Sequence, residues 1–173
     1  MGTVYKVVRV AEERWGIAEE RWVSSFLGTS DLNLVRERLE VGVYLEYRLQ
    51  ERTQGVIGPI FVFTTPPTIA EFSHVTDGSP GCRYRVLRCS TRCNPRPLYQ
   101  LPLIGAARNS LHLIKLFWSH PARDAIKNGF YKNFALVRSL VPTKASEELG
   151  MPVPDTEYHR ILGKLVRSDK VQS

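Results

Sequence analysis

Apolar residues recur at every second position in several short stretches of the chain. Between residues 41 and 47 the apolar and aromatic side chains fall on one face of an extended chain, and these are Val41, Val43, Leu45 and Tyr47. This period is typical of a strand with one buried face. Similar stretches predict further strands at residues 3–10, 21–27 and 82–89.

The segment 60–65 is almost continuously apolar and β-branched, and a turn sequence containing proline lies on each side of it. Such a run predicts a short strand that is buried on both faces. Thr64 or Thr65 is then expected to cap a helix, because both precede prolines that the first turn of a helix accepts. The apolar face of this helix carries Ile69, Phe72 and Val75.

The second half of the chain predicts short helices and one more strand. Prolines between residues 95 and 102 exclude a helix there and allow at most an edge strand. A strand is predicted at residues 134–141, and short helices at 119–129 and 143–150. For residues 32–39 the pattern leaves a helical turn and an extended segment both open. The clearest helix comes last, where apolar side chains follow the i, i+3, i+4, i+7 spacing of one helical face, at Tyr158, Ile161, Leu162 and Leu165.

These elements predict an α+β fold in a single domain covering residues 1–173. We expect a small mixed or antiparallel sheet of about five to six strands, with short helices and a C-terminal amphipathic helix. Residues 1–90 form its β-rich acidic part, and residues 91–173 form its basic part with short helices. The length of 173 residues matches one domain of ordinary size.

Cysteine usage and hydropathy predict a cytoplasmic, intracellular protein. The chain has 3 cysteines, an odd number, and it begins with strand-like alternation instead of a secretory signal. No apolar run approaches the ~20 residues that a membrane-spanning helix requires. We therefore expect a reducing compartment and no membrane insertion.

Charge is distributed unevenly along the chain. Residues 1–80 contain 8 Lys or Arg and 11 Asp or Glu, a net charge of −3, whereas residues 81–173 contain 16 and 6, a net charge of +10. Between Gly81 and Arg138 there are 11 basic residues and a single acid, Asp124. Such asymmetry indicates an anionic partner, of which nucleic acid is the commonest.

The basic segment supplies the residues that we predict to bind nucleic acid or another polyanion without a cofactor. Lys and Arg neutralise phosphates, and aromatic rings in the same segment offer surfaces on which bases stack. An arginine-rich stretch is also typical of an ordinary solvated surface, and an acidic protein is an alternative partner. The predicted binding residues are Arg83, Arg85, Arg88, Arg92, Arg96, Arg108, Lys115, Arg123, Lys127 and Lys132.

The cysteines raise two further hypotheses. Cys82, Cys89 and Cys93, with His74, contain the ligand types that zinc prefers, but they lack the tight C-x-x-C spacing of structural zinc sites. Ordinary free thiols are the favoured interpretation, and no metal is expected. A nucleophilic cysteine would need a neighbouring imidazole to lower its pKa. The chain also lacks the glycine-rich phosphate loop, HExxH and GxSxG patterns of familiar enzymes.

The order of the motifs YKVVR, WVSSF, VYLEYRL, GPIFVFTTPPTIAEF and YRVLRC resembles a loose group of small uncharacterised proteins of phages and large DNA viruses. The resemblance covers about the first 90 residues and implies a viral source. It implies no activity.

The same order of elements also resembles small ADP-ribosyltransferase-like folds, in which short strands hold a nicotinamide dinucleotide. This second resemblance implies a transferase with a pocket over the first three strands, lined by Arg9, Ser24, Ser25 and Glu46. The chain departs from that family because it lacks a Ser-Thr-Ser and Glu-x-Glu set. Three hypotheses therefore stand, namely nucleic-acid or polyanion binding, a transferase, and a non-enzymatic protein that docks an acidic partner.

Overall fold

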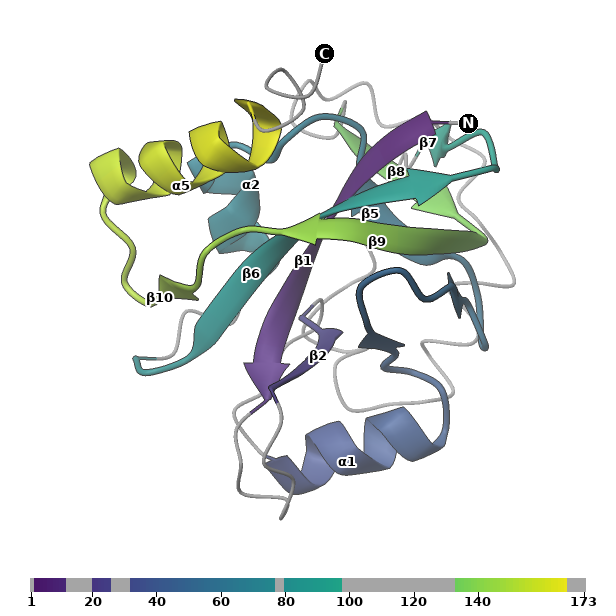
Figure 1. Cartoon of the computed structure of the whole chain (residues 1–173). Coiled ribbons are helices and arrows are strands. Elements are labelled where there is room, and N and C mark those ends of the chain that lie inside the picture. Colours follow the sequence, from purple (N-terminus) through teal and green to yellow (C-terminus); the bar gives the residue numbers. More distant parts are fainter. Residues whose placement is uncertain (1, 12–19, 26–31, 77–79, 98–132, 168–173) are drawn as a thin grey trace.

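The computed structural model of the chain describes residues 2–11, 20–25, 32–76, 80–97 and 133–167. Within these residues an antiparallel sheet carries the helices α1 (Leu32–Glu40), α2 (Ile69–His74) and α5 (Asp155–Arg167) (Figure 1). The longer described strands are β1 (Gly2–Ala11), β2 (Arg21–Ser24), β5 (Ile60–Phe63), β6 (Arg83–Thr91), β8 (Phe134–Val137) and β9 (Ser139–Ala145). Two-residue strands are β3 (Glu46–Tyr47), β4 (Thr53–Gln54), β7 (Arg96–Pro97) and β10 (Leu149–Gly150). The predicted α+β class with an antiparallel sheet and a C-terminal helix is confirmed.

Strand β1 is the centre of the sheet. It pairs with β6 along most of its length, and with β2 and β5 on its other edge. Strand β8 continues into β9 through the single residue Arg138, and β8 pairs with β5 whereas β9 pairs with β6. Strand β1 pairs with both β5 and β6, and the continuous segment of β8 and β9 joins the outer edges of these two strands. The sheet therefore curves around, and one of its faces is turned inward.

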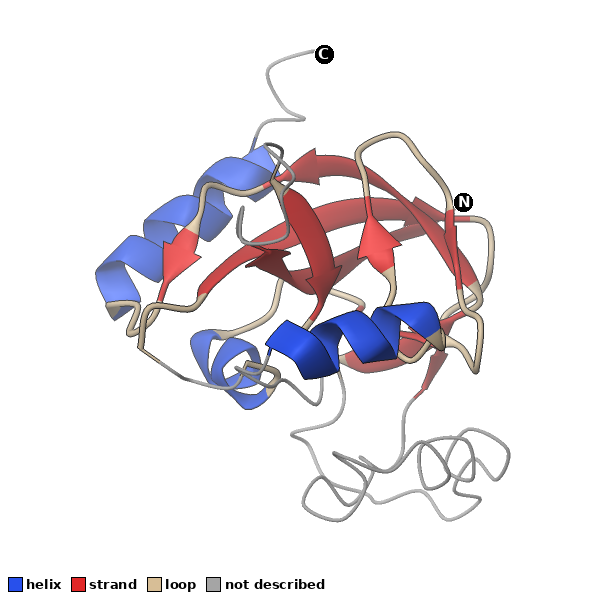
Figure 2. Cartoon of the chain, turned by 90° about the horizontal axis from the view of Figure 1, so that it is seen from below, coloured by secondary structure: helices blue, strands red, loops and turns tan. Residues whose placement is uncertain are grey.

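The outer face of the sheet is covered by α2 and α5, which lie on the same side of it in Figure 1. Phe72 of α2 and the four predicted apolar residues of α5 are buried there against Tyr84 and Val86 of β6. Helix α1 lies at the other end of the molecule, in the foreground of Figure 2, and packs Val35 against Val23. The predicted C-terminal helix and its apolar face are therefore confirmed.

The inward face encloses a second apolar core that includes Val4, Val8, Val62 and Leu87. Alternation along β1 also sends the side chain of Lys6 to this face, where it is only 4% exposed. Its Nζ donates a hydrogen bond to the Phe61 carbonyl at 2.8 Å. Burial lowers the pKa of Lys6 from 10.5 to about 8, because the apolar surroundings disfavour the charged form.

The predicted strand at residues 41–47 is wrong for most of its length. Residues 32–39 are helical, and after α1 ends Gly42 turns the chain with a φ of +79°, a conformation that favours glycine. Tyr44 is then buried against α1, where its hydroxyl accepts a hydrogen bond from Arg38 Nη1 at 2.6 Å. Val41 is 48% exposed, and only the two residues of β3 are extended and paired.

The helix α2 is confirmed, but the predicted cap at Thr64 or Thr65 is wrong. Thr68 is the cap, since its hydroxyl accepts from the Glu71 N–H at 3.1 Å while the Glu71 carboxylate accepts from the Thr68 N–H at 2.9 Å. Thr64 and Thr65 instead donate their hydroxyls to the side-chain oxygen of Asn133.

The predicted helix at residues 143–150 is also wrong, because these residues form the end of β9, a short connection and β10 along the edge of β6. The Ser146 hydroxyl accepts a hydrogen bond from the Val86 N–H at 2.9 Å, which holds this connection against β6. The strands predicted at residues 3–10 and 82–89 are confirmed, that at 60–65 is confirmed as far as Phe63, and that at 21–27 is confirmed as β2, with residues 26 and 27 outside the described part of the chain. The strand predicted at 134–141 is divided by Arg138 into β8 and β9. The predicted helix at 119–129 lies outside the described residues. Among the described helices, none is long and apolar enough to cross a membrane.

Candidate functional site

Two of the arginines predicted to bind nucleic acid are held in ion pairs. As alternation along β6 predicts, Arg83 and Arg85 point away from the core face that Tyr84 joins. Arg83 Nη1 lies 3.1 Å from Glu148 Oε1, and Arg85 Nε donates to the carboxylate of Glu20. This hydrogen bond from Arg85 lowers the pKa of Glu20 below its ordinary value. The two guanidinium charges are thus offset by carboxylates.

The other predicted binding residues divide into three groups. Arg88 is half-buried on β6, in register with Tyr5 of β1 and Lys144 of β9. Arg92 and Arg96 are exposed where the chain passes from β6 to β7. The remaining five lie outside the described residues, namely Arg108, Lys115, Arg123, Lys127 and Lys132.

Two arginines that were not among the predicted binding residues lie beside Arg92 and Arg96. Arg52 precedes β4, and Arg138 separates β8 from β9. All four side chains are exposed, and none of them makes an ion pair with another described residue. We call Arg52, Arg92, Arg96 and Arg138 the arginine face.

The four residues of the arginine face line two adjoining cavities. Arg52 and Arg92 line a cavity of about 140 Å³, and Arg96 and Arg138 line one of about 360 Å³ that also contains Cys93. The two cavities adjoin because Arg92 and Cys93 are consecutive in the chain, as are Arg138 and Ser139, which lines the smaller cavity. Of the described residues that line either cavity, none is acidic. The charged side chains among these lining residues are therefore all basic.

Long-range pairing brings these arginines together. Arg96 lies in register with Leu136, the Thr91 hydroxyl donates to the Ser139 carbonyl at 2.9 Å, and the Gly55 N–H donates to the Arg138 carbonyl at 2.9 Å. Arg138 is among the basic residues counted between Gly81 and Arg138 in the sequence, but that count does not show that Arg138 lies near Arg92. Arg52 lies in the acidic part of the chain, so no local sequence pattern could have assigned it to this site.

Cys93 is the partly exposed thiol of this site. Desolvation acts to raise its pKa, but hydrogen bonds from the backbone of Arg138 and Ser139 and from the Ser139 hydroxyl outweigh it and lower the pKa below its ordinary value. Cys82 and Cys89 are buried, and burial raises the pKa of Cys89 to about 12. The rate at which Cys93 is alkylated can therefore be used to detect a ligand bound at the arginine face.

We expect the native protein to react with iodoacetamide fastest at Cys93, because the thiolate is the nucleophile and the other two thiols are buried. The rate should rise with pH through a midpoint below the ordinary pKa of a cysteine thiol. Ser139→Ala should raise that midpoint, since it removes a hydroxyl that stabilises the thiolate. Mass spectrometry of the alkylated peptides measures each rate, and Cys93→Ser is the control. Equal rates at all three cysteines would contradict this assignment.

The cysteines do not converge on a metal site. Cys82 belongs to the outer core with α2 and α5, whereas Cys89 belongs to the inner core. Within the described part of the chain, no group of three or more His, Cys, Asp or Glu side chains has the arrangement to hold a metal ion.

The residues considered for transferase chemistry lie on or beside the adjacent strands β1, β2 and β3, but they do not line one described cavity. Ser24 is buried, and its hydroxyl accepts from the Leu45 N–H at 3.0 Å. Ser25 is also buried, and its hydroxyl donates to the Val7 carbonyl at 2.9 Å. Arg9 is half-buried on β1 in register with Val23. None of these three is among the described residues that line the cavity at Glu46.

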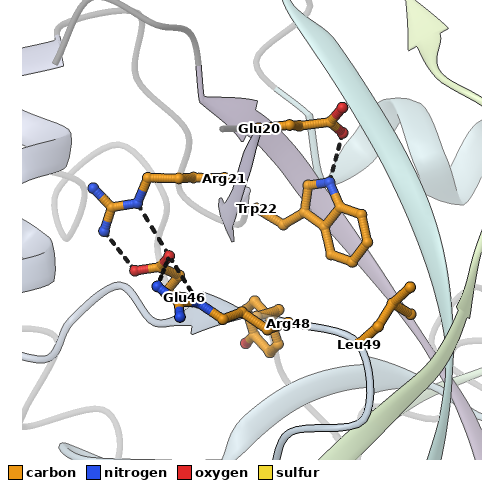
Figure 3. A pocket seen from close by; sticks show the side chains of 7 residues that line it. Glu20, Arg21, Trp22, Glu46, Arg48 and Leu49 are labelled. Atoms are coloured by element: carbon orange, nitrogen blue, oxygen red, sulfur yellow. Dashed lines mark hydrogen bonds and ion pairs between the residues drawn. The ribbon is translucent and has the colours of Figure 1, made fainter. Parts of the chain in front are cut away.

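Glu46 lies in a cavity of about 370 Å³ between β2 and the chain that follows β3 (Figure 3). Arg21 and Arg48 both reach its carboxylate, and the hydrogen bond from Arg21 lowers the pKa of Glu46 below its ordinary value. We call this cavity the Trp22 pocket, and the residues that line it are Glu20, Arg21, Trp22, Glu46, Tyr47, Arg48 and Leu49.

Compared with protein-family models, with curated proteins and with solved structures, the chain matches none. The site is therefore interpreted from its own geometry and charge.

Proposed function

We propose that the protein binds nucleic acid through the arginine face. The observation that carries the proposal is the convergence of four exposed arginines around two cavities, with no acid among the described lining residues. A guanidinium group presents a planar fork of donors that matches the oxygens of a phosphate group. Successive phosphates of a nucleic acid could therefore be held by successive arginines, each contact releasing condensed counterions.

The contrast with Arg83 and Arg85 supports this assignment. Their charges are offset by Glu20 and Glu148, so a phosphate would have to compete with carboxylates already in place. Arg92 and Arg96 face no such competition from described residues. We therefore assign the binding role to the arginine face and give Arg83 and Arg85 a structural role.

The double variant Arg92→Ala, Arg96→Ala is expected to weaken nucleic-acid binding roughly 10-fold to 100-fold, because two charge-assisted contacts are lost. The dependence of log affinity on log salt should also become shallower by about 0.7–0.9 for each contact removed. Fluorescence anisotropy with a labelled oligonucleotide at several salt concentrations measures both effects. Bound nucleic acid should also slow the alkylation of Cys93, which lies between the two arginines in the chain.

The matched control is the double variant Arg160→Ala, Arg167→Ala on α5, which changes the net charge equally at exposed positions. Equal loss of affinity in both double variants would show that only net charge matters and would overturn the site. An acidic protein partner would also lose affinity with the arginine face, but nuclease treatment would not release it from the protein.

A further inference from the structure

The Trp22 pocket contains an aromatic side chain on which a flat ring can stack. The indole of Trp22 packs on the inner core, and its Nε1 donates to Glu20 Oε1 at 2.6 Å. Trp22 is only half-buried and lines the cavity together with Leu49, so part of the indole is open to a ligand. The volume of about 370 Å³ lies at the small end of the range of about 300–1,000 Å³ for ligand pockets. A single aromatic ring system suits these dimensions.

The charges in this pocket differ from those of the arginine face. Glu46 and Glu20 oppose Arg21 and Arg48, so the ionised side chains that line the pocket balance. Both carboxylates are also engaged, Glu46 by the two arginines and Glu20 by Arg85. A phosphate has no net attraction to such a pocket. An uncharged ring with polar edges can stack on Trp22 and meet both donors and acceptors at the rim.

The chain connects the Trp22 pocket directly to the arginine face. Arg48 and Leu49 line the pocket. Gln50, the next residue, and Arg52, which follows the exposed Glu51, line the smaller cavity of the arginine face with Arg92. The Gln50 N–H donates to the Pro142 carbonyl at 2.8 Å, which fixes this turn against β9. One short turn of the chain therefore joins the Trp22 pocket to the arginine face.

We propose that the ligand is a single-stranded nucleic acid and that the Trp22 pocket holds one of its bases stacked on the indole. This inference rests on the proposed function, because the phosphates must first be bound by the arginine face. A duplex keeps its bases stacked and paired, so it cannot place a base in the pocket without unpairing it. The protein thus prefers single strands to duplexes.

The test compares three probes, namely an oligodeoxythymidine of about 16 nucleotides, a duplex of the same length, and heparin. Trp22→Ala is expected to weaken oligodeoxythymidine binding roughly 10-fold to 100-fold and to leave heparin binding unchanged. Trp22→Phe keeps a ring and should retain most of the affinity. Equal oligodeoxythymidine affinity of Trp22→Ala and the parent would overturn the inference while the proposed function stands.

A second measurement needs no change at Trp22. In the variant Trp15→Phe, Trp118→Phe the remaining tryptophan fluorescence comes from Trp22, since the chain has 3 tryptophans. Oligodeoxythymidine should quench it, whereas heparin and the duplex should not. Binding of all three probes without quenching would overturn the base pocket alone. Failure of every probe to bind the parent protein would overturn the proposed function as well.

Discussion

Phe134→Ala is expected to lower the free energy of unfolding by about 3–5 kcal/mol, the range for removing a buried phenylalanine side chain. Phe134 is 1% exposed, and its ring centroid lies 5.0 Å from those of both Phe61 and Phe63 in edge-to-face contacts. The substitution leaves a cavity beside two rings that the paired strands β5 and β8 hold in place. It also removes both aromatic contacts, each of which adds about 0.5–1.5 kcal/mol to the burial.

Urea denaturation followed by circular dichroism measures the effect of Phe134→Ala. The control is Val166→Ala on α5, at a position that is 38% exposed, where a change within about 0.5 kcal/mol is expected. A comparable loss of stability in both variants would show that the three-ring cluster is not a principal part of the core.

Lys6→Met is expected to raise the free energy of unfolding at pH 7. Burial lowers the pKa of Lys6 from 10.5 in the unfolded chain to about 8 in the folded protein, a difference that corresponds to about 3 kcal/mol against the folded state. Methionine has a similar unbranched shape without the charge. In the variant the Phe61 carbonyl loses the hydrogen bond from Lys6 Nζ. This loss lowers the free energy of unfolding by about 1–3 kcal/mol. A net stabilisation of up to about 2 kcal/mol should remain.

The pH dependence of the stability difference between Lys6→Met and the parent tests whether the buried charge of Lys6 causes it. Below pH 8 Lys6 is protonated in both the folded and unfolded states, so the full cost of burying the charge is present. Between pH 8 and pH 10.5 the folded protein has released this proton while the unfolded chain still holds it, so the parent gains stability as pH rises. The advantage of Lys6→Met should therefore shrink across this window and disappear near its upper end.

The difference between the two unfolding curves reports Lys6 together with Cys89, the buried thiol whose charge interacts with that of Lys6. Groups that do not interact with Lys6 affect both proteins equally. Lys144→Met is the matched control, since Lys144 is a less buried lysine on β9. A stability difference between parent and Lys6→Met that stays constant from pH 7 to pH 11 would contradict the buried charge.

Local sequence patterns determined the elements that bury a continuous or regularly spaced apolar face. The run at 60–65 predicted a strand buried on both sides, and residues 60–63 form β5, which pairs with β1 and β8. The i, i+3, i+4, i+7 spacing in the last helix predicted its buried face at Tyr158 and Leu165. In both cases neighbouring residues in the chain supply the pattern, so the sequence alone suffices.

Tertiary structure decided the places where two local patterns compete. Alternation at residues 41–47 is overridden by the end of α1 and the turn at Gly42, because burying Tyr44 against that helix takes precedence over extending the strand. Residues 143–150 have the composition of a short helix, but the open edge of β6 provides hydrogen-bond partners for an extended chain. Pairing with a distant strand cannot be seen in a local window.

The sequence by itself determined that the chain is strongly basic beyond residue 80, and hence the class of partner that we propose. Only the tertiary structure decided which arginines are neutralised by Glu20 and Glu148, and which gather as the arginine face. The physical reason is that charge interactions act over a few ångströms in space. Arg52 and Arg138 are far apart in sequence, and only the pairing of β4 with β9 brings their parts of the chain together.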